Sequence, residues 1–98
     1  MPKLEIHLNE GFAGDSVEIR VGGAPPVAFE NVSTDYSLGL AKKTQFELPA
    51  GHCRVDVAIR GGPTATTDLT IDADLYLSVR KEGGQLHFSP SNSPTAYF

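Results

Sequence analysis

Apolar and polar residues alternate over many short stretches of this chain, a pattern typical of β-strands with one buried and one exposed face. The stretch from residue 3 to 8 shows it first, and the stretch from 53 to 60 repeats it without a fault. Because successive side chains of a strand point to opposite faces, each stretch predicts one inward set. The inward sets are Leu4, Ile6 and Leu8; Val17, Ile19 and Val21; Phe46 and Leu48; Cys53, Val55, Val57 and Ile59; Thr67, Leu69 and Ile71; Leu75, Leu77 and Val79; and Leu86 and Phe88.

Glycine and proline stand between these stretches, where the chain must reverse. Examples are residues 22–26 (GGAPP), Pro49–His52, residues 61–63 (GGP) and the pair at 83–84. About eight short strands with such spacing predict an all-β fold, an antiparallel two-sheet β-sandwich of immunoglobulin-like or transthyretin-like type with seven to eight strands. We expect one domain over residues 1–90 and an irregular tail over 91–98, because the last residues are polar and proline-bearing.

The alternation fails between Ser33 and Ala41, which predicts an irregular crossover or a single helical turn capped by Ser33 or Thr34. This segment and the chain end hold apolar groups that a partner could use. The candidate interaction residues are Tyr36, Leu38, Leu40, Tyr97 and Phe98. The alternative is that these side chains simply cap the open ends of the sandwich. Edge strands of a short sandwich are a second candidate surface, since their free amides and carbonyls can accept a partner strand.

Two segments resemble a known family. Residues 46–57 (FELPAGHCRVDV) are similar to the hairpin of PEGA-type and carboxypeptidase-regulatory-like sandwiches, in which L-P-A-G joins two strands. Residues 16–23 (SVEIRVGG) are similar to the entry strand of those modules. The resemblance implies a transthyretin-like or immunoglobulin-like module with an adhesive, scaffolding or accessory role, and it carries no catalytic residues. The segment from Ser33 to Ala41 is longer than the connections of that family.

Net charge, cysteine content and the absence of long apolar runs limit the classes of partner and of protein that we expect. The formal net charge is −4 and the eight basic residues are scattered, which argues against a nucleic-acid partner because phosphate binding needs clustered Lys and Arg. The single cysteine, Cys53, cannot form an intramolecular disulfide, so a disulfide-stapled secreted scaffold is not expected. We find no apolar run typical of a signal peptide or a transmembrane helix. We therefore expect a cytoplasmic protein without a membrane partner.

Metal ligands of the right type occur, but without the spacing that a metal site needs. The candidates are His7, His52, Cys53 and His87, and none forms a close pair such as C-x-x-C or H-x-x-x-H. His7 and His87 fall on outward positions and would meet only if the first and last strands paired. Asp72 and Asp74 flank one residue at a turn, without the further oxygen ligands of a calcium loop. We expect surface histidines and turn carboxylates, and leave metal binding open as the alternative.

No pattern of catalysis stands out. The chain has no G-x-S-x-G motif, and Cys53 lies at an inward position where a thiol behaves as a small hydrophobe. The glycine doublets sit between strands and not before a helix, so they predict turns and not a phosphate cradle. We therefore expect a non-enzymatic module, without cofactor, that binds a protein or assembles with itself. The alternative is a small-ligand or metal-binding accessory domain.

Overall fold

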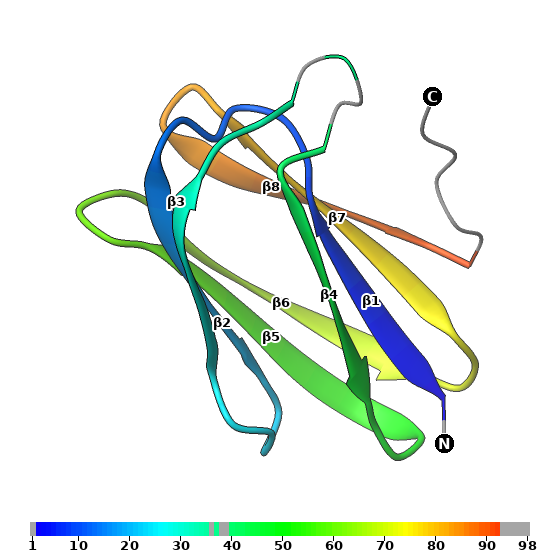
Figure 1. Cartoon of the computed structure of the whole chain (residues 1–98). Coiled ribbons are helices and arrows are strands. Elements are labelled where there is room, and N and C mark those ends of the chain that lie inside the picture. The colour runs from blue at the N-terminus through cyan, green and yellow to red at the C-terminus, as the bar shows by residue number, and fades with distance from the viewer. Residues whose placement is uncertain (1, 36, 38–39, 93–98) are drawn as a thin grey trace.

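The computed structural model describes residues 2–35, 37 and 40–92, and within them every regular element is a β-strand (Figure 1). The strand pattern read from the sequence is confirmed, with boundaries shifted by a few residues. The strands are β1 (Lys3–Leu8), β2 (Asp15–Val21), β3 (Val27–Val32), β4 (Lys42–Glu47), β5 (Gly51–Ile59), β6 (Thr64–Ile71), β7 (Leu75–Glu82) and β8 (Gln85–Ser91).

The strands form two four-stranded sheets packed face to face, which confirms the two-sheet β-sandwich (Figure 1). The first sheet, sheet A, has the order β4-β1-β7-β8, and the second, sheet B, has the order β3-β2-β5-β6. One pairing departs from the antiparallel expectation: β1 and β7 run parallel in the middle of sheet A, with Ile6 beside Leu77. Hairpins cannot produce such a pair, because parallel neighbours need a long connection through other elements.

The core lies between the sheets and holds the side chains that the alternation placed inward. Ile6, Ile19, Val55 and Leu77 are fully buried, and Cys53 is 7% exposed. Burial of one such aliphatic side chain contributes about 1.5–3 kcal/mol to folding, so these alternating positions supply most of the stabilisation. Thr67, Leu75 and Phe88 are inward but half-buried, since they lie toward the margins of the sheets.

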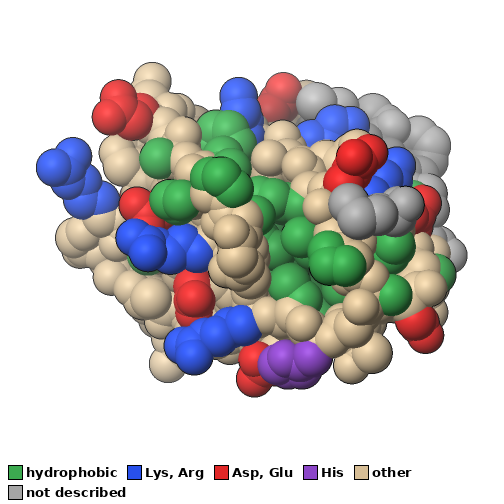
Figure 2. Space-filling model, turned by 90° about the horizontal axis from the view of Figure 1, so that it is seen from below, with side chains coloured by type: hydrophobic (Ala, Val, Ile, Leu, Met, Phe, Trp, Pro, Cys, Tyr) green, Lys and Arg blue, Asp and Glu red, His purple; other side chains and the backbone are tan. Residues whose placement is uncertain are grey.

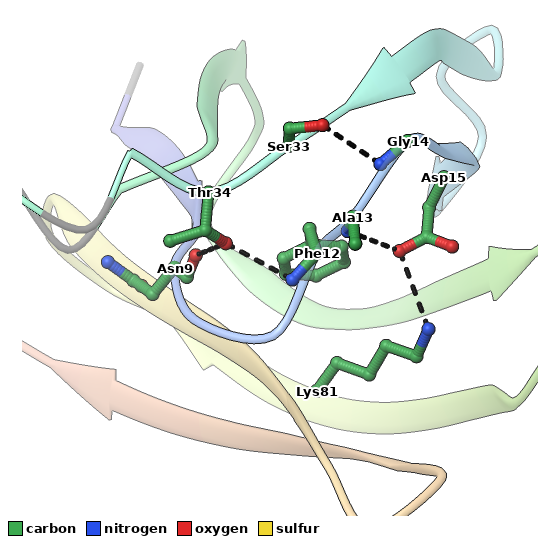
Figure 3. A network of polar contacts seen from close by, with 8 residues as sticks. All are labelled: Asn9, Phe12, Ala13, Gly14, Asp15, Ser33, Thr34 and Lys81. Carbon is green, nitrogen blue, oxygen red and sulfur yellow. Dashed lines mark hydrogen bonds and ion pairs between the residues drawn. The ribbon is translucent and has the colours of Figure 1, made fainter.

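The loop between β1 and β2 closes one end of the sandwich with an aromatic plug that the sequence pattern did not mark as core (Figure 3). Phe12 is only 2% exposed. Its backbone N–H donates to Thr34 Oγ1 at 3.1 Å, and its carbonyl accepts from the Thr34 N–H at 2.9 Å. The Thr34 hydroxyl in turn donates to the carbonyl of Asn9 at 2.6 Å. These bonds fix the loop against the segment that leaves β3.

The same loop is held against β7 from the other side. The Lys81 N–H donates to the carbonyl of Glu10 at 2.9 Å, and the Lys81 ammonium lies 3.4 Å from Asp15 Oδ2 (Figure 3). Gly11 has φ +93°, and a Cβ built there would lie 1.9 Å from the Lys81 carbonyl oxygen. Only glycine fits this position, because both the backbone conformation and the close approach exclude a side chain.

The remaining segments agree in part with the sequence expectations. After β3 the chain forms no helical turn among the described residues, and Asp35 and Leu40 make an isolated antiparallel bridge. β8 continues through Pro90 to Ser91, one residue into the expected tail, and residues 93–98 of that tail lie outside the described residues. In the described part of the chain, no helix is long and apolar enough to span a bilayer.

Candidate functional site: the edges of the two sheets

The apolar residues predicted for interaction are largely beyond what the structure describes. Tyr36, Leu38, Tyr97 and Phe98 lie outside the described residues. Leu40 is half-buried, and its backbone exchanges two hydrogen bonds with Asp35, at 3.0 and 3.4 Å. This contact places Asp35 and Leu40 side by side before β4. The use of these residues in binding stays a prediction.

His7 corrects one expectation. Alternation placed it on an exposed face, but it is 3% exposed, and it lies between Lys43 of β4 and Ser78 of β7, which are level with it in the neighbouring strands. Its Nε2 lies 2.7 Å from Glu5 Oε1 on the same face of the strand. The hydrogen bond from His7, with the charges of His7, Lys3 and Lys43, lowers the pKa of Glu5 below its ordinary value against the opposing effect of burial.

The metal-ligand candidates are separated by the topology. β7 lies between β1 and β8, so His7 is level with Ser78 while His87 is level with Arg80, and the two histidines do not pair. Asp74 Oδ1 accepts from the Lys3 N–H at 3.0 Å, so this carboxylate ties the turn before β7 to the start of β1. Among the described residues, no three side chains of His, Cys, Asp or Glu gather where they could hold a metal ion.

Cys53 is a buried thiol at the inward position expected for it. Burial raises its pKa, which lowers the fraction of reactive thiolate at neutral pH. Its neighbour His52 points to the opposite, exposed face and lies 3.5 Å from Asp68 Oδ1 on β6. The two adjacent residues therefore do not converge on one site.

The edge strands of the two sheets are β3, β4, β6 and β8, and β6 is the longest of them. The Ile59 N–H donates to the carbonyl of Pro63 at 3.0 Å. Ile59 and Pro63 are therefore a hydrogen-bonded pair, and every second residue of β6 from there on bonds to β5 in the same way. Antiparallel pairs alternate between hydrogen-bonded and non-hydrogen-bonded positions. The residues whose N–H and C=O groups point away from β5 are therefore Thr64, Thr66, Asp68 and Thr70. No proline, glycine or bulge interrupts Thr64–Ile71.

The edge at β3 is short and blocked at both ends. Its pairing with β2 leaves only Ala28 and Glu30 with groups that point away. Pro26 precedes the strand, and the register slips by one residue near Asn31, whose φ is +56°. Such a bulge twists an edge strand and breaks the ladder that a partner would need.

The other two edge strands, β4 and β8, hinder pairing with a partner strand in other ways. β4 turns the backbone groups of Lys43, Gln45 and Glu47 outward, and charged side chains on an edge disfavour pairing with another chain. β8 begins at a two-residue turn of Gly83 and Gly84, which have φ +61° and +75°, as a type I′ hairpin requires. Its outward-pointing residues then include Pro90, which has no N–H to donate.

A cleft of about 460 Å³ lies between the end of β3 and the start of β4. Phe29 and Val32 line it from β3, and Lys42 lines it from β4. The Lys42 ammonium lies 5.2 Å from the centre of the Phe29 ring, within the range of a cation–π contact. Figure 2 shows the opposite end of the molecule, seen from below, where hydrophobic side chains gather in the middle with charged side chains around them.

Polar pairs brace β6 against β5 on the exposed face of sheet B. The Thr66 hydroxyl donates to Asp56 Oδ1, and this bond, with a smaller contribution from Arg54, lowers the pKa of Asp56. Asp68 carries the only charge on β6 and faces His52. The outward side chains of β6 are thus short, polar and exposed.

No family model matches this chain, and no curated protein matches it either. The resemblance to PEGA-type modules therefore stays a prediction that rests on the two quoted segments.

Sequence reasoning recognised that edge strands exist but did not single out β6. Residues 64–71 alternate as the central strand β5 does, so alternation alone does not separate an edge from an interior strand. The useful signal was the absence of Lys, Arg, Pro and Gly from this stretch, together with three exposed threonines. This composition indicates an open edge only when the strand order shows that β6 lies at the edge of its sheet.

Proposed function

We propose that this chain is a non-enzymatic protein-interaction module that binds an extended segment of a protein partner along β6 by strand addition. In this mode the free backbone groups of a sheet edge bond to the main chain of the partner, and alternate side chains supply selectivity. The proposal develops the binding role expected from the sequence and assigns it to a defined element.

The observation that carries the proposal is the contrast among the edges. β3 is limited by Pro26 and a bulge, β4 carries charged residues, and β8 carries Pro90. β6 is also preceded by a proline, Pro63, and carries one charge, Asp68, but none of its eight residues is proline, glycine or lysine, and no bulge interrupts them. Because proteins commonly protect edges against unwanted pairing, a long edge with so little protection supports a role in wanted pairing.

The side chains of β6 describe the kind of segment that would fit. Thr64, Thr66, Asp68 and Thr70 are exposed on the outer face, while Leu69 is buried on the inner one. A partner segment should therefore alternate in the same way, with small polar groups opposite the threonines. Cross-strand pairs of this kind contribute about 0.2–1 kcal/mol each, in addition to the backbone bonds.

The test is site-specific photo-crosslinking in the native host. A photoreactive residue replaces Thr70 on β6 or, as a control, the exposed Gln85 on β8. We expect adducts from position 70 only. The substitution Thr66→Pro removes an N–H that points away from β5, so it should abolish the adduct while the fold persists; Thr66→Val keeps that N–H and should retain the adduct. Adducts that are absent at 70, or insensitive to Thr66→Pro, would contradict the proposal.

A small ligand in the cleft between β3 and β4 is the second candidate. The cation and the aromatic ring that meet at Lys42 and Phe29 would suit an anionic or aromatic group. A fragment screen by NMR distinguishes the two functions. Amide shifts that cluster at Phe29, Val32 and Ala41, with none on β6, would favour the ligand.

A further inference from the structure

The partner strand that fits the edge of β6 best is β6 of a second copy of the same chain. Resting on the proposed function, we infer that the strand added to β6 is β6 of a second copy of this chain, antiparallel and related by a twofold axis at Thr67. Closed twofold dimers are the commonest form of self-association, and they use one surface that is complementary to itself.

The register follows from the backbone groups that β6 leaves free. Thr64, Thr66, Asp68 and Thr70 point away from β5, and they are placed symmetrically about Thr67. With the axis at Thr67, Thr64 faces Thr70 of the second copy and Thr66 faces Asp68 of the second copy. Every free N–H and C=O of these residues then has a partner, since each such pair exchanges both backbone hydrogen bonds.

Neighbouring registers are worse on two grounds. A shift of the axis to Asp68 would place the two Asp68 carboxylates directly opposite each other, and like charges opposite one another are destabilising. It would also leave Thr64 facing Asp72, beyond the end of the strand. A shift to Thr66 leaves Thr70 opposite Gly62 in the turn before β6. The axis at Thr67 alone uses the full length of the strand.

The side chains agree with this register. Each Asp68 would lie opposite the Thr66 hydroxyl of the second copy while keeping His52 beside it on β5, 3.5 Å away. On the inner face, Ala65 would lie opposite Leu69, a small residue against a larger one. Sheet B would continue across the axis as one sheet of eight strands, and the unprotected edge would be removed.

A disulfide tests the register. At the axis the two Thr67 residues form a non-hydrogen-bonded pair with Cα atoms about 4.5 Å apart, which a disulfide can span, whereas the two Thr66 residues would lie about 8 Å apart. In a Cys53→Ala background, we expect Thr67→Cys to form a disulfide-linked dimer under mild oxidation at least tenfold faster than Thr66→Cys. Equal rates at the two positions would overturn the register.

Sedimentation equilibrium tests the dimer without cysteines. The wild-type chain should show reversible dimers as its concentration approaches about 1 mM, the range of a weak association. Thr66→Pro should be monomeric and Thr66→Val should still dimerise, with circular dichroism confirming that each variant is folded. A second blocking variant, Thr66→Asp, places a carboxylate opposite Asp68 of the second copy and should also be monomeric, because like charges directly opposite each other are destabilising. A wild-type monomer at every concentration would overturn the inference.

The two proposals fail separately. If the chain is monomeric and Thr67→Cys does not cross-link, while photo-crosslinking at position 70 captures a different polypeptide, self-pairing is wrong and strand addition at β6 stands. If position 70 yields no adduct of any mass, both are wrong. An adduct with the mass of two copies supports both.

Discussion

The loop that plugs the end of the sandwich allows a sharp test with glycine substitutions. Gly11→Ala would place a Cβ 1.9 Å from the Lys81 carbonyl oxygen, at a backbone φ of +93°. A positive φ costs an alanine about 1–2 kcal/mol, and forcing an extra methyl against packed backbone costs about 1–3 kcal/mol. Alanine also lowers the entropy of the unfolded chain, which returns about 0.4–1 kcal/mol. We expect the free energy of unfolding to fall by about 1–4.5 kcal/mol.

Two other glycines separate these contributions. Gly83 has φ +61° but nothing within 4 Å of a built Cβ, so Gly83→Ala measures the backbone cost alone and should destabilise the fold by about 1 kcal/mol or less. Gly23 has neither a positive φ nor a neighbour within 4 Å, so Gly23→Ala should change stability by less than about 0.5 kcal/mol. Urea unfolding followed by circular dichroism gives the three values. If Gly11→Ala is no more destabilising than Gly83→Ala, the close approach of the Lys81 carbonyl oxygen adds nothing to the cost of the substitution, and the reasoning is refuted.

Three further predictions concern single side chains. Thr34→Val removes the hydroxyl that bonds the backbone at Asn9 and Phe12, and should cost about 1–3 kcal/mol in urea unfolding, while Thr34→Ser should keep most of the stability. The pKa of Glu5 is lowered in the folded state. The ionised Glu5 therefore stabilises the fold at a pH above the ordinary glutamate pKa, and this stabilisation is lost as the pH falls through the pKa that Glu5 has in the folded state. Glu5→Gln should therefore destabilise the fold more near pH 7 than near pH 3, as urea unfolding at the two pH values would show; an equal effect at both would contradict the pairing with His7. Cys53 should react with a thiol reagent at pH 7 far more slowly in the folded chain than in urea, and similar rates would show that it is accessible.

The sequence was sufficient for the strands and their inward faces because both depend on neighbouring residues. Leu4, Ile6 and Leu8 must share a face whatever the strand pairs with, since the side-chain period of a strand is two. The position of a strand within its sheet is a different matter. The burial of His7 and the aromatic plug at Phe12 arise from contacts with strands distant in sequence, and alternation contains no information on them.

The candidate site shows the same division. Pro90 and the lysines of β4 could be recognised in the sequence as residues that disfavour pairing, but only the strand order shows that they lie on edges. The symmetry of β6 about Thr67 is visible in the letters TATTDLTI only once the hydrogen-bonding phase is known. Leu40 was the one predicted contact residue that the structure describes, and its backbone pairs with that of Asp35.

The parallel pair of β1 and β7 has a consequence for the order of assembly during synthesis. Every strand of sheet B is available once residue 71 has been made, whereas β1, made first, lacks one of its two neighbours until residue 82. We expect sheet B to acquire protection against amide exchange earlier than the β1–β7 ladder in pulse-labelled refolding, because contacts that span most of the chain form slowly. Of the eight described strands, the first to be synthesised would then be among the last to complete its pairing.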